Sequence, residues 1–404
     1  MKADKINQYY FDDFNTPPVK FDRREFLNRL GGGIIIVFSL SQLAFTKALR
    51  GGDDEYPEFN AYLRVREDGF VDCFSGKIEM GQGINTSLAQ VLADELEVSL
   101  DRVNMIMGDT DLVPYDAGTW GSMTTRFHDP LIRAAAAEAR LVLIELAAEK
   151  LDVPAGQLEA TNGKVVVKSD KSKFVTYEEL TNGKKIVRGL SEKPVIKKSG
   201  EFDVIGKSFL RRDGVEKATG KALYSADIQL PGMLYAKIVR PPAHGSKLIS
   251  VKTSEAEAMP GVKLLREDDF IVVLHAHPEM AEKAMNAIKT EWEIPPSKAD
   301  DETIFAHILR TATDGRERHS GGDLEQGKKE ADILFDEEYH DGYKAHASIE
   351  THTATAVFED GKITMWASSQ TPFGTRQEIS EQLKLPLEKV HLKQIFLGGG
   401  FGGK

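Results

Sequence analysis

The residues best suited to chemistry in this 404-residue chain gather in glycine-rich loops. One such loop, Gly398–Lys404, holds five glycines around Phe401. Glycine lacks a Cβ, so the loop reaches positive φ at little cost and brings main-chain N–H groups close to a ligand. We therefore expect a bound anionic or planar cofactor along this loop, lined by Gly399, Gly400, Phe401 and Gly402.

A second pattern, Gly81-Gln82-Gly83, follows strand-like alternation at residues 61–74 and precedes apolar residues at helical spacing. We expect that helix to begin near Thr86 or Ser87. At such a junction, free N–H groups and the positive end of the helix attract a phosphate or a polar ring. The loop lacks the third glycine of the dinucleotide fingerprint. A tight connection that binds no ligand is the alternative interpretation.

Polar residues of two further segments can supply hydrogen bonds. Hydroxyls and glycines crowd residues 118–125, ahead of an alanine-rich helix predicted around 134–146, and the candidates there are Ser122, Thr124 and Thr125. Such groups bind an anion or simply cap the helix. Gln370, in a Ser-Gln-Thr-Pro turn before a helix predicted at 375–383, can offer its amide to a pocket.

Other ionisable residues leave the catalytic group unassigned. His346 and Glu350 suit general acid–base chemistry, but a structural histidine and a buried glutamate explain them equally well. His244, His275 and His277 lack the spacing of a metal site, so we expect no metal bound by side chains.

Charge and cysteine content limit the partners. The chain has 52 basic and 63 acidic residues, a net charge of −11, which disfavours nucleic acid as a partner. Its single cysteine, Cys73, excludes a cysteine-ligated iron–sulfur cluster within this chain, so a cluster of that kind would belong to another subunit. Cys73 lies in strand-like alternation, which predicts a buried thiol.

The first 50 residues form a separate region. Arg23-Arg24, followed by Phe26-Leu27 and an apolar run at 34–45, predicts a twin-arginine export signal and hence a periplasmic protein. The run has 12 residues, too few to span a bilayer as a helix. A buried core helix is the alternative. Because no clean cleavage site follows, an uncleaved signal could anchor the protein to the membrane.

Taken together, the Gln370 turn, the Gly398–Lys404 loop and Glu79–Gly83 resemble the molybdopterin-binding subunits of the xanthine dehydrogenase and aldehyde oxidase family. Residues 215–245 are similar to that family's α/β hammerhead module. The Gly-Gln-Gly loop comes before the hammerhead, a permuted order that resembles the beta subunit of isoquinoline 1-oxidoreductase.

The resemblance implies an α+β fold with a hammerhead module and incomplete molybdopterin-binding domains. Four regions are expected: the signal at 1–50, a molybdopterin-binding subdomain at 56–200, the hammerhead at 205–300, and the start of a molybdenum-binding domain at 320–404. The cofactor would be molybdopterin with molybdenum, as the cytosine dinucleotide. Its pterin or phosphates would contact Gly81, Gln82, Gly83, Ser122, Thr124 and Thr125, while Gln370 would hydrogen-bond an oxo ligand of the metal.

The implied activity is a molybdenum hydroxylase, which inserts water-derived oxygen at an electron-poor carbon of an N-heterocycle or aldehyde. Electrons would pass to a [2Fe-2S] subunit, with a cytochrome c as a further partner. In the family, the catalytic glutamate lies in a downstream Gly-Glu-Pro segment that has no counterpart here, and Glu350 does not match it. We therefore expect a truncated fragment that is inactive alone. A non-catalytic exported binding or assembly protein, or an enzyme with another nucleotide cofactor, are the alternatives.

Overall fold

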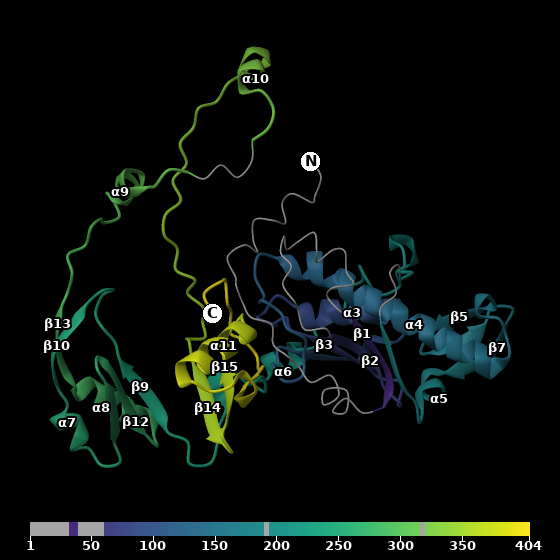
Figure 1. The fold of residues 1–404 in the computed structure, drawn as a ribbon, viewed down its shortest axis with the longest axis horizontal. Helices are drawn as coiled ribbons and strands as arrows, with labels where there is room; N and C mark the ends of the chain where they lie inside the picture. The colour runs from purple at the N-terminus through teal and green to yellow at the C-terminus, as the bar shows by residue number, and fades with distance from the viewer. Residues whose placement is uncertain (1–31, 39–59, 190–193, 316–319) are drawn as a thin grey trace. The chain divides into compact units, whose positions relative to one another are not determined.

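The computed structural model describes residues 32–38, 60–189, 194–315 and 320–404 (Figure 1). The chain divides into two compact units, one of residues up to 228 together with 346–404, and one of residues 229–345. Residues 205–228, which the sequence suggested would open the hammerhead region, are therefore grouped with the first unit. Every loop singled out above lies in that unit.

The first unit is organised around a mixed five-stranded sheet of order β4-β3-β2-β1-β8. Its strands, in that order, are Val103–Met107, Val71–Ser75, Asn60–Val65, Gly33–Phe38 and Lys185–Gly189. β1 runs antiparallel to β2 and parallel to β8. β1 therefore joins β2, the next strand along the chain, to β8, which is distant in sequence.

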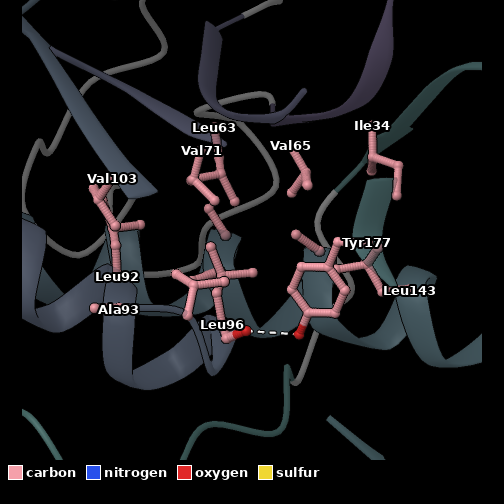
Figure 2. Packing of buried hydrophobic residues seen from close by; sticks show 14 of the residues in the cluster. Ile34, Leu63, Val65, Val71, Leu92, Ala93, Leu96, Val103, Leu143 and Tyr177 are labelled. Carbon is pink, nitrogen blue, oxygen red and sulfur yellow. Dashed lines mark hydrogen bonds between the residues drawn. The ribbon is translucent and has the colours of Figure 1, made fainter. Parts of the chain in front are cut away.

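Two helices, α3 (Ile84–Leu96) and α4 (Asp129–Leu151), pack with the sheet to form the main core. Both agree with the helices that apolar spacing predicts. Figure 2 shows this core, in which the buried Tyr177 donates a hydrogen bond from its hydroxyl to the Leu96 carbonyl at 2.7 Å. A smaller cluster joins Ile35, Phe74, Val113 and Phe373.

Cys73 belongs to β3 and is fully buried, as predicted. Burial, with the nearby Asp72 carboxylate as a second cause, raises the pKa of its thiol far above the usual range. The thiol is therefore protonated at neutral pH and serves as a small apolar group in the core.

Part of the predicted export signal is a core strand in this structure. Ile34, Ile35 and Ile36 of β1 have no exposed side-chain area. A run of β-branched residues favours a strand over a helix, which explains why a strand forms here instead of the core helix considered above. The twin arginines and residues 39–50 lie outside the described residues.

Three further groups of elements complete the first unit. A meander holds β5 (Leu158–Thr161), β6 (Lys164–Val167) and β7 (Asp170–Thr176), followed by α5 (Tyr177–Thr181). A short helix, α6, covers Gly214–Ala218. The C-terminal part has a β14-β15-β16 sheet with α11, at Ala354–Glu359, Lys362–Ala367, Val390–Lys393 and Pro372–Leu383.

The second unit is a small α+β module. One sheet has the order β11-β12-β9, from Lys263–Glu267, Phe270–His275 and Tyr235–Val239. Strands β10 (Lys247–Lys252) and β13 (Lys289–Glu293) form a separate pair. The helices are α7 (Ser254–Glu257), α8 (Pro278–Ala287), α9 (Ile304–Thr311) and α10 (Leu324–Glu330).

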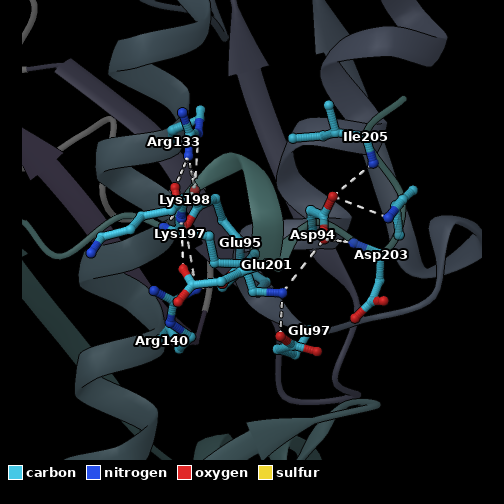
Figure 3. Close-up of polar contacts among 12 residues, drawn as sticks. Asp94, Glu95, Glu97, Arg133, Arg140, Lys197, Lys198, Glu201, Asp203 and Ile205 are labelled. Carbon is cyan, nitrogen blue, oxygen red and sulfur yellow. Dashed lines mark hydrogen bonds and ion pairs between the residues drawn. The ribbon is translucent and has the colours of Figure 1, made fainter. Parts of the chain in front are cut away.

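Buried acids of α3 hold the connector that follows β8 (Figure 3). The Asp94 carboxylate accepts hydrogen bonds from the N–H groups of Asp203, Val204 and Ile205 at 2.7–3.1 Å. Burial acts to raise the pKa of Asp94, but these three donors and Lys197 outweigh it and the pKa is lowered. Glu95, fully buried, binds the guanidinium of Arg133 at 2.7 Å. The connector is thus fixed to the helix by charge as well as by packing.

Within the described ranges, no helix is both long and apolar enough to cross a membrane. The same residues contain no group of three or more His, Cys, Asp or Glu side chains that could hold a metal ion.

Candidate cofactor site

The Gly-Gln-Gly loop leads directly into α3, but its N–H groups already have an acceptor. The Glu79 carboxylate accepts hydrogen bonds from the N–H groups of Gly81 and Gly83, at 2.9 and 3.0 Å, and from that of Asn85 at 3.0 Å. Glu79 is buried. An internal carboxylate therefore occupies the place at the helix start where free donors for a phosphate were expected.

Gln82 is also tied to its own loop. Its side-chain oxygen accepts from the Met80 N–H at 2.7 Å, and its amide nitrogen donates to the Ile78 carbonyl at 2.9 Å. From outside the loop, Arg211 donates to the Gly81 carbonyl at 2.7 Å and pairs with Asp213 at 2.8 Å. This arrangement gives the loop a defined shape.

The segment at 118–125 contacts the other loops through Thr119. The Thr119 hydroxyl accepts from the Ile78 N–H at 2.9 Å, next to the Gly-Gln-Gly loop. The Thr119 N–H donates to the Gln370 carbonyl at 3.0 Å, and the Gln370 amide nitrogen donates to the Thr119 carbonyl at 2.7 Å. Three loops that are far apart in sequence therefore meet at Thr119.

The three hydroxyl candidates lie just beyond this junction. Thr124 is buried at the start of a π-helical turn, Thr124–His128, that leads into α4, while Ser122 and Thr125 are exposed. Among the described residues, Thr119 and the Gly118 carbonyl, which accepts from Lys77 at 2.8 Å, join this segment to its neighbours, and these three hydroxyls do not. Their predicted contact with a cofactor stays a prediction.

The C-terminal glycine loop wraps around Gln370, whose side chain is 3% exposed. The Gln370 side-chain oxygen accepts from the Gly402 N–H at 2.9 Å and from the Lys404 N–H at 3.4 Å. Its backbone N–H donates to the Lys404 carbonyl at 3.0 Å. An amide nitrogen carries two hydrogens, and the contact with Thr119 uses only one of them.

Close approach explains why these positions are glycines. A Cβ on Gly400 would lie 2.5 Å from the Gln370 amide oxygen, and one on Gly398 would lie 2.3 Å from the Glu350 Cβ. A Cβ on Gly403 would lie 2.9 Å from the ring of His346. The loop therefore fits tightly against side chains of the protein itself, while Phe401 is 71% exposed beside them.

Backbone strain concentrates at the same loops. Nine non-glycine residues in the described ranges have positive φ. Six cap helices or sit in hairpin turns, where such angles are ordinary. The remaining three are Ser122, Ala347 and Phe401, with φ of 54°, 47° and 56°. Strain of this kind is kept mainly where the surroundings impose it, often at functional sites.

The electrostatics of the α4 start are unusual. His128 is buried and its Nε2 lies 2.8 Å from the Ser75 hydroxyl, and burial lowers the pKa of His128 to about 4. Next to it, burial raises the pKa of Asp129 to about 6 against a weaker opposing effect of Arg133. The imidazole is therefore neutral at pH 7, whereas the Asp129 carboxylate is mostly ionised at that pH.

The sequence identified the three loops but not the contacts that hold them. Glu79 accepts from the N–H groups of its own loop, Thr119 bonds Ile78 and Gln370, and Glu350, considered above only for acid–base chemistry, bonds Gly398 and Lys404. An acidic residue just before a helix-opening glycine loop is a signal for an internal acceptor, and Glu79 could have been found that way. Thr119 carries no such signal, because its role depends on long-range contacts with Ile78 and Gln370.

The molybdopterin cofactor-binding domain family matches this chain twice, over residues 7–225 and over residues 308–404. The first match alone covers more than half of the chain. The chain therefore belongs to the molybdopterin cofactor-binding family, which confirms the resemblance and identifies molybdopterin with molybdenum as the cofactor class.

Curated relatives carry different names. A nicotinate dehydrogenase component of Pseudomonas putida is 30% identical over 85% of this chain and 30% of its own length. A membrane-bound aldehyde dehydrogenase (pyrroloquinoline-quinone) of Gluconacetobacter polyoxogenes is 29% identical over 96% of the chain and 53% of its length. The beta subunit of isoquinoline 1-oxidoreductase of Brevundimonas diminuta is 27% identical over 85% and 50%. The chain thus spans about a third to a half of these relatives.

Proposed function

We propose that this chain forms the molybdopterin-binding part of a molybdenum hydroxylase, which inserts water-derived oxygen at an electron-poor carbon of an N-heterocycle or aldehyde. The observation that carries the proposal is the meeting of the three predicted cofactor loops at Thr119 and Gln370. Family membership supplies the cofactor class. The names of the relatives support both substrate classes without choosing between them.

The residues fit a bound molybdopterin unevenly. Gln370 is buried, is held at both ends of its amide and keeps one N–H for a further acceptor, so it suits a fixed donor toward the cofactor. Gly400 and Gly402 lie against it, and Gly399 and Phe401 flank them in the loop. The N–H groups of Gly81 and Gly83 fit a phosphate poorly, because Glu79 accepts from both.

Bound molybdopterin supplies the redox and oxygen-transfer chemistry of such enzymes. The residues of this chain would bind and orient it. Gln370 would donate a hydrogen bond to an oxo ligand of the metal, and Ser122, Thr124 and Thr125 would contact the pterin or the nucleotide phosphates, for which we propose the cytosine dinucleotide. No residue is assigned as catalytic base.

The remaining expectations belong to the same proposal. The single cysteine supports a separate [2Fe-2S] subunit as electron acceptor, with a cytochrome c beyond it. The twin-arginine motif supports export to the periplasm in folded form.

Cofactor content tests this proposal directly. The protein is purified from a host that makes molybdopterin, and molybdenum and released cytidine nucleotide are measured per chain. We expect near-stoichiometric amounts in the unaltered protein and a strong loss in Gln370→Ala. Gln377→Ala is the matched control, because Gln377 is a half-buried amide on α11 that donates its hydrogen bond to Glu381 at 2.9 Å, outside the candidate site. Absence of molybdenum from all three proteins would overturn the proposal.

A further inference from the structure

Both ends of the Gly398–Lys404 loop contact one carboxylate, that of Glu350. Its Oε2 accepts from the Gly398 N–H at 2.9 Å and from the Lys404 ammonium at 2.7 Å. The Glu350 N–H donates in turn to the Gly398 carbonyl at 3.2 Å. The loop is therefore closed by a single side chain that lies 48 residues before its first glycine.

The ion pair is buried. The Lys404 side chain has no exposed area, and that of Glu350 is 10% exposed. A buried charge that loses its partner is strongly unfavourable, so each of these groups depends on the other. In addition, Glu350 Oε1 is buried and has no hydrogen-bond partner among the described residues. All the bonding of the carboxylate thus falls on the oxygen that faces the loop.

The loop in turn holds Gln370. The Gln370 side chain contacts the N–H groups of Gly402 and Lys404, and its backbone contacts the Lys404 carbonyl. Displacing Lys404 would remove two of these three contacts. A substitution at Glu350 would therefore alter the position of Gln370 by way of the loop. No hydrogen bond in the described residues joins Glu350 to Gln370 directly.

We propose that Glu350 is a positioning residue, whose ion pair with Lys404 closes the glycine loop and thereby fixes Gln370 and Gly402 in the cofactor site. This role does not require Glu350 to touch a substrate or to transfer a proton. It rests on the proposed function only where it refers to the cofactor, because the closure of the loop is a property of the chain itself.

Hydrogen exchange of the loop amides tests the closure without any cofactor. In Glu350→Gln, the buried ammonium of Lys404 loses its charge partner, and we expect the amides of Gly402 and Lys404 to exchange at least about tenfold faster. The amides of β3, in the main sheet, should keep their exchange rates. Unchanged loop amides, or an equal acceleration in β3, would overturn the proposal.

A double variant separates positioning from stability. Glu350→Gln combined with Lys404→Met removes both charges, so the thermal midpoint should recover while the loop amides remain fast. Glu95→Gln is the control for general destabilisation, because Glu95 is also a buried acid in an ion pair, with Arg133, and both residues are far in sequence from the glycine loop. It should lower the midpoint without selective acceleration of the loop. Recovery of slow loop exchange in the double variant would contradict a positioning role.

Cofactor content then links the closure to the site. If the unaltered protein binds molybdenum, Glu350→Gln and the double variant should both lose most of it, whereas Glu95→Gln should retain it in its folded fraction. Retention of full molybdenum by Glu350→Gln would overturn the link. If the unaltered protein binds none, the hydroxylase proposal fails, and the exchange measurements still decide whether Glu350 closes the loop.

Discussion

The Gly81–Gly83 loop and the Gly398–Lys404 loop differ in which side chains accept hydrogen bonds from their main-chain N–H groups. Both are rich in glycine, and in both the main-chain N–H groups donate to a buried side chain of the protein. In the first loop, the Glu79 carboxylate accepts hydrogen bonds from the N–H groups of Gly81, Gly83 and Asn85, where α3 begins. In the second, Glu350 and Gln370 share the acceptor role.

The glycines differ in why they are needed. Gly81 has φ of +108°, and a Cβ there would meet nothing within 4 Å. Gly400 has no such φ, yet its Cβ would lie 2.5 Å from Gln370. The first loop therefore needs glycine for its backbone angle, and the second needs it for close approach. Equal glycine content thus hides two physical requirements, which substitutions can separate.

Removal of the Glu79 carboxylate should have the largest effect. Glu79→Ala leaves three main-chain N–H groups without their acceptor and removes a partner of Arg211. We expect the free energy of unfolding to fall by about 3 kcal/mol, since each unsatisfied donor costs about 1 kcal/mol. Urea denaturation measures this change. Glu149→Ala, at an exposed position on α4, is the control and should change stability little. Equal results for the two variants would refute the internal-acceptor role of Glu79.

Gly400→Ala should come next. The added methyl group must push Gln370 away from Thr119, and overpacking of this kind costs about 2 kcal/mol. Denaturation of Gly400→Ala alone and in the Gln370→Ala background forms a double-mutant cycle. The penalty for Gly400→Ala should shrink once the Gln370 side chain is gone. If it stays the same, the glycine is needed for another reason than the approach of Gln370.

Much of the site could be predicted from local pattern. Glycine content, hydroxyls before a helix and a strand-end amide identified the loops, because each depends on a few neighbouring residues. Apolar spacing likewise predicted α3, alanine content predicted α4, and a helix was expected at the position of α11. The acceptors of the loop N–H groups could not be found that way, since Glu350 lies 48 residues before Gly398 in the sequence and meets it only in the fold.

The N-terminal segment shows most clearly that the composition of a short segment does not determine its structure. An apolar run after paired arginines predicts an export signal, yet part of that run forms β1 between β2 and β8. A short apolar stretch fits a signal core and a buried strand equally well, because both require only the exclusion of charge. The pairing of β1 with β2 and β8 accounts for the strand, and the export signal stays a prediction, since the twin arginines lie outside the described residues.

Gly81→Ala should have a smaller effect than Gly400→Ala. Here the cost is backbone strain alone, about 1 kcal/mol, because an L-residue avoids φ of +108° while space for the methyl group is free. Gly220→Ala is a matched control, with φ of +71° and open space around its Cβ. The two variants should lose similar stability in urea. A loss at Gly81 far above that at Gly220 would show that the first loop also needs close approach.

The smallest effect is expected at Asp129, the acid at the start of α4. Its Oδ1 is buried and has no hydrogen-bond partner in the described ranges, whereas the Glu79 carboxylate before α3 accepts several hydrogen bonds. Burial raises the pKa of Asp129 from 3.8 to about 6. Between these values the folded protein binds more protons than the unfolded chain, so the contribution of Asp129 to stability is present below pH 4 and is lost as the pH rises through 6.

Asp129→Asn removes this dependence. The stability of the variant relative to the unaltered protein should therefore rise from pH 4 to pH 7, by less than about 1 kcal/mol because solvent screens a partly exposed carboxylate. Urea denaturation at both pH values measures the difference. His128, with a pKa lowered to about 4, titrates in the opposite sense but is common to both proteins, so its contribution largely cancels. A relative stability that falls with pH would mean that Asp129 has a donor in solution and resembles Glu79 after all.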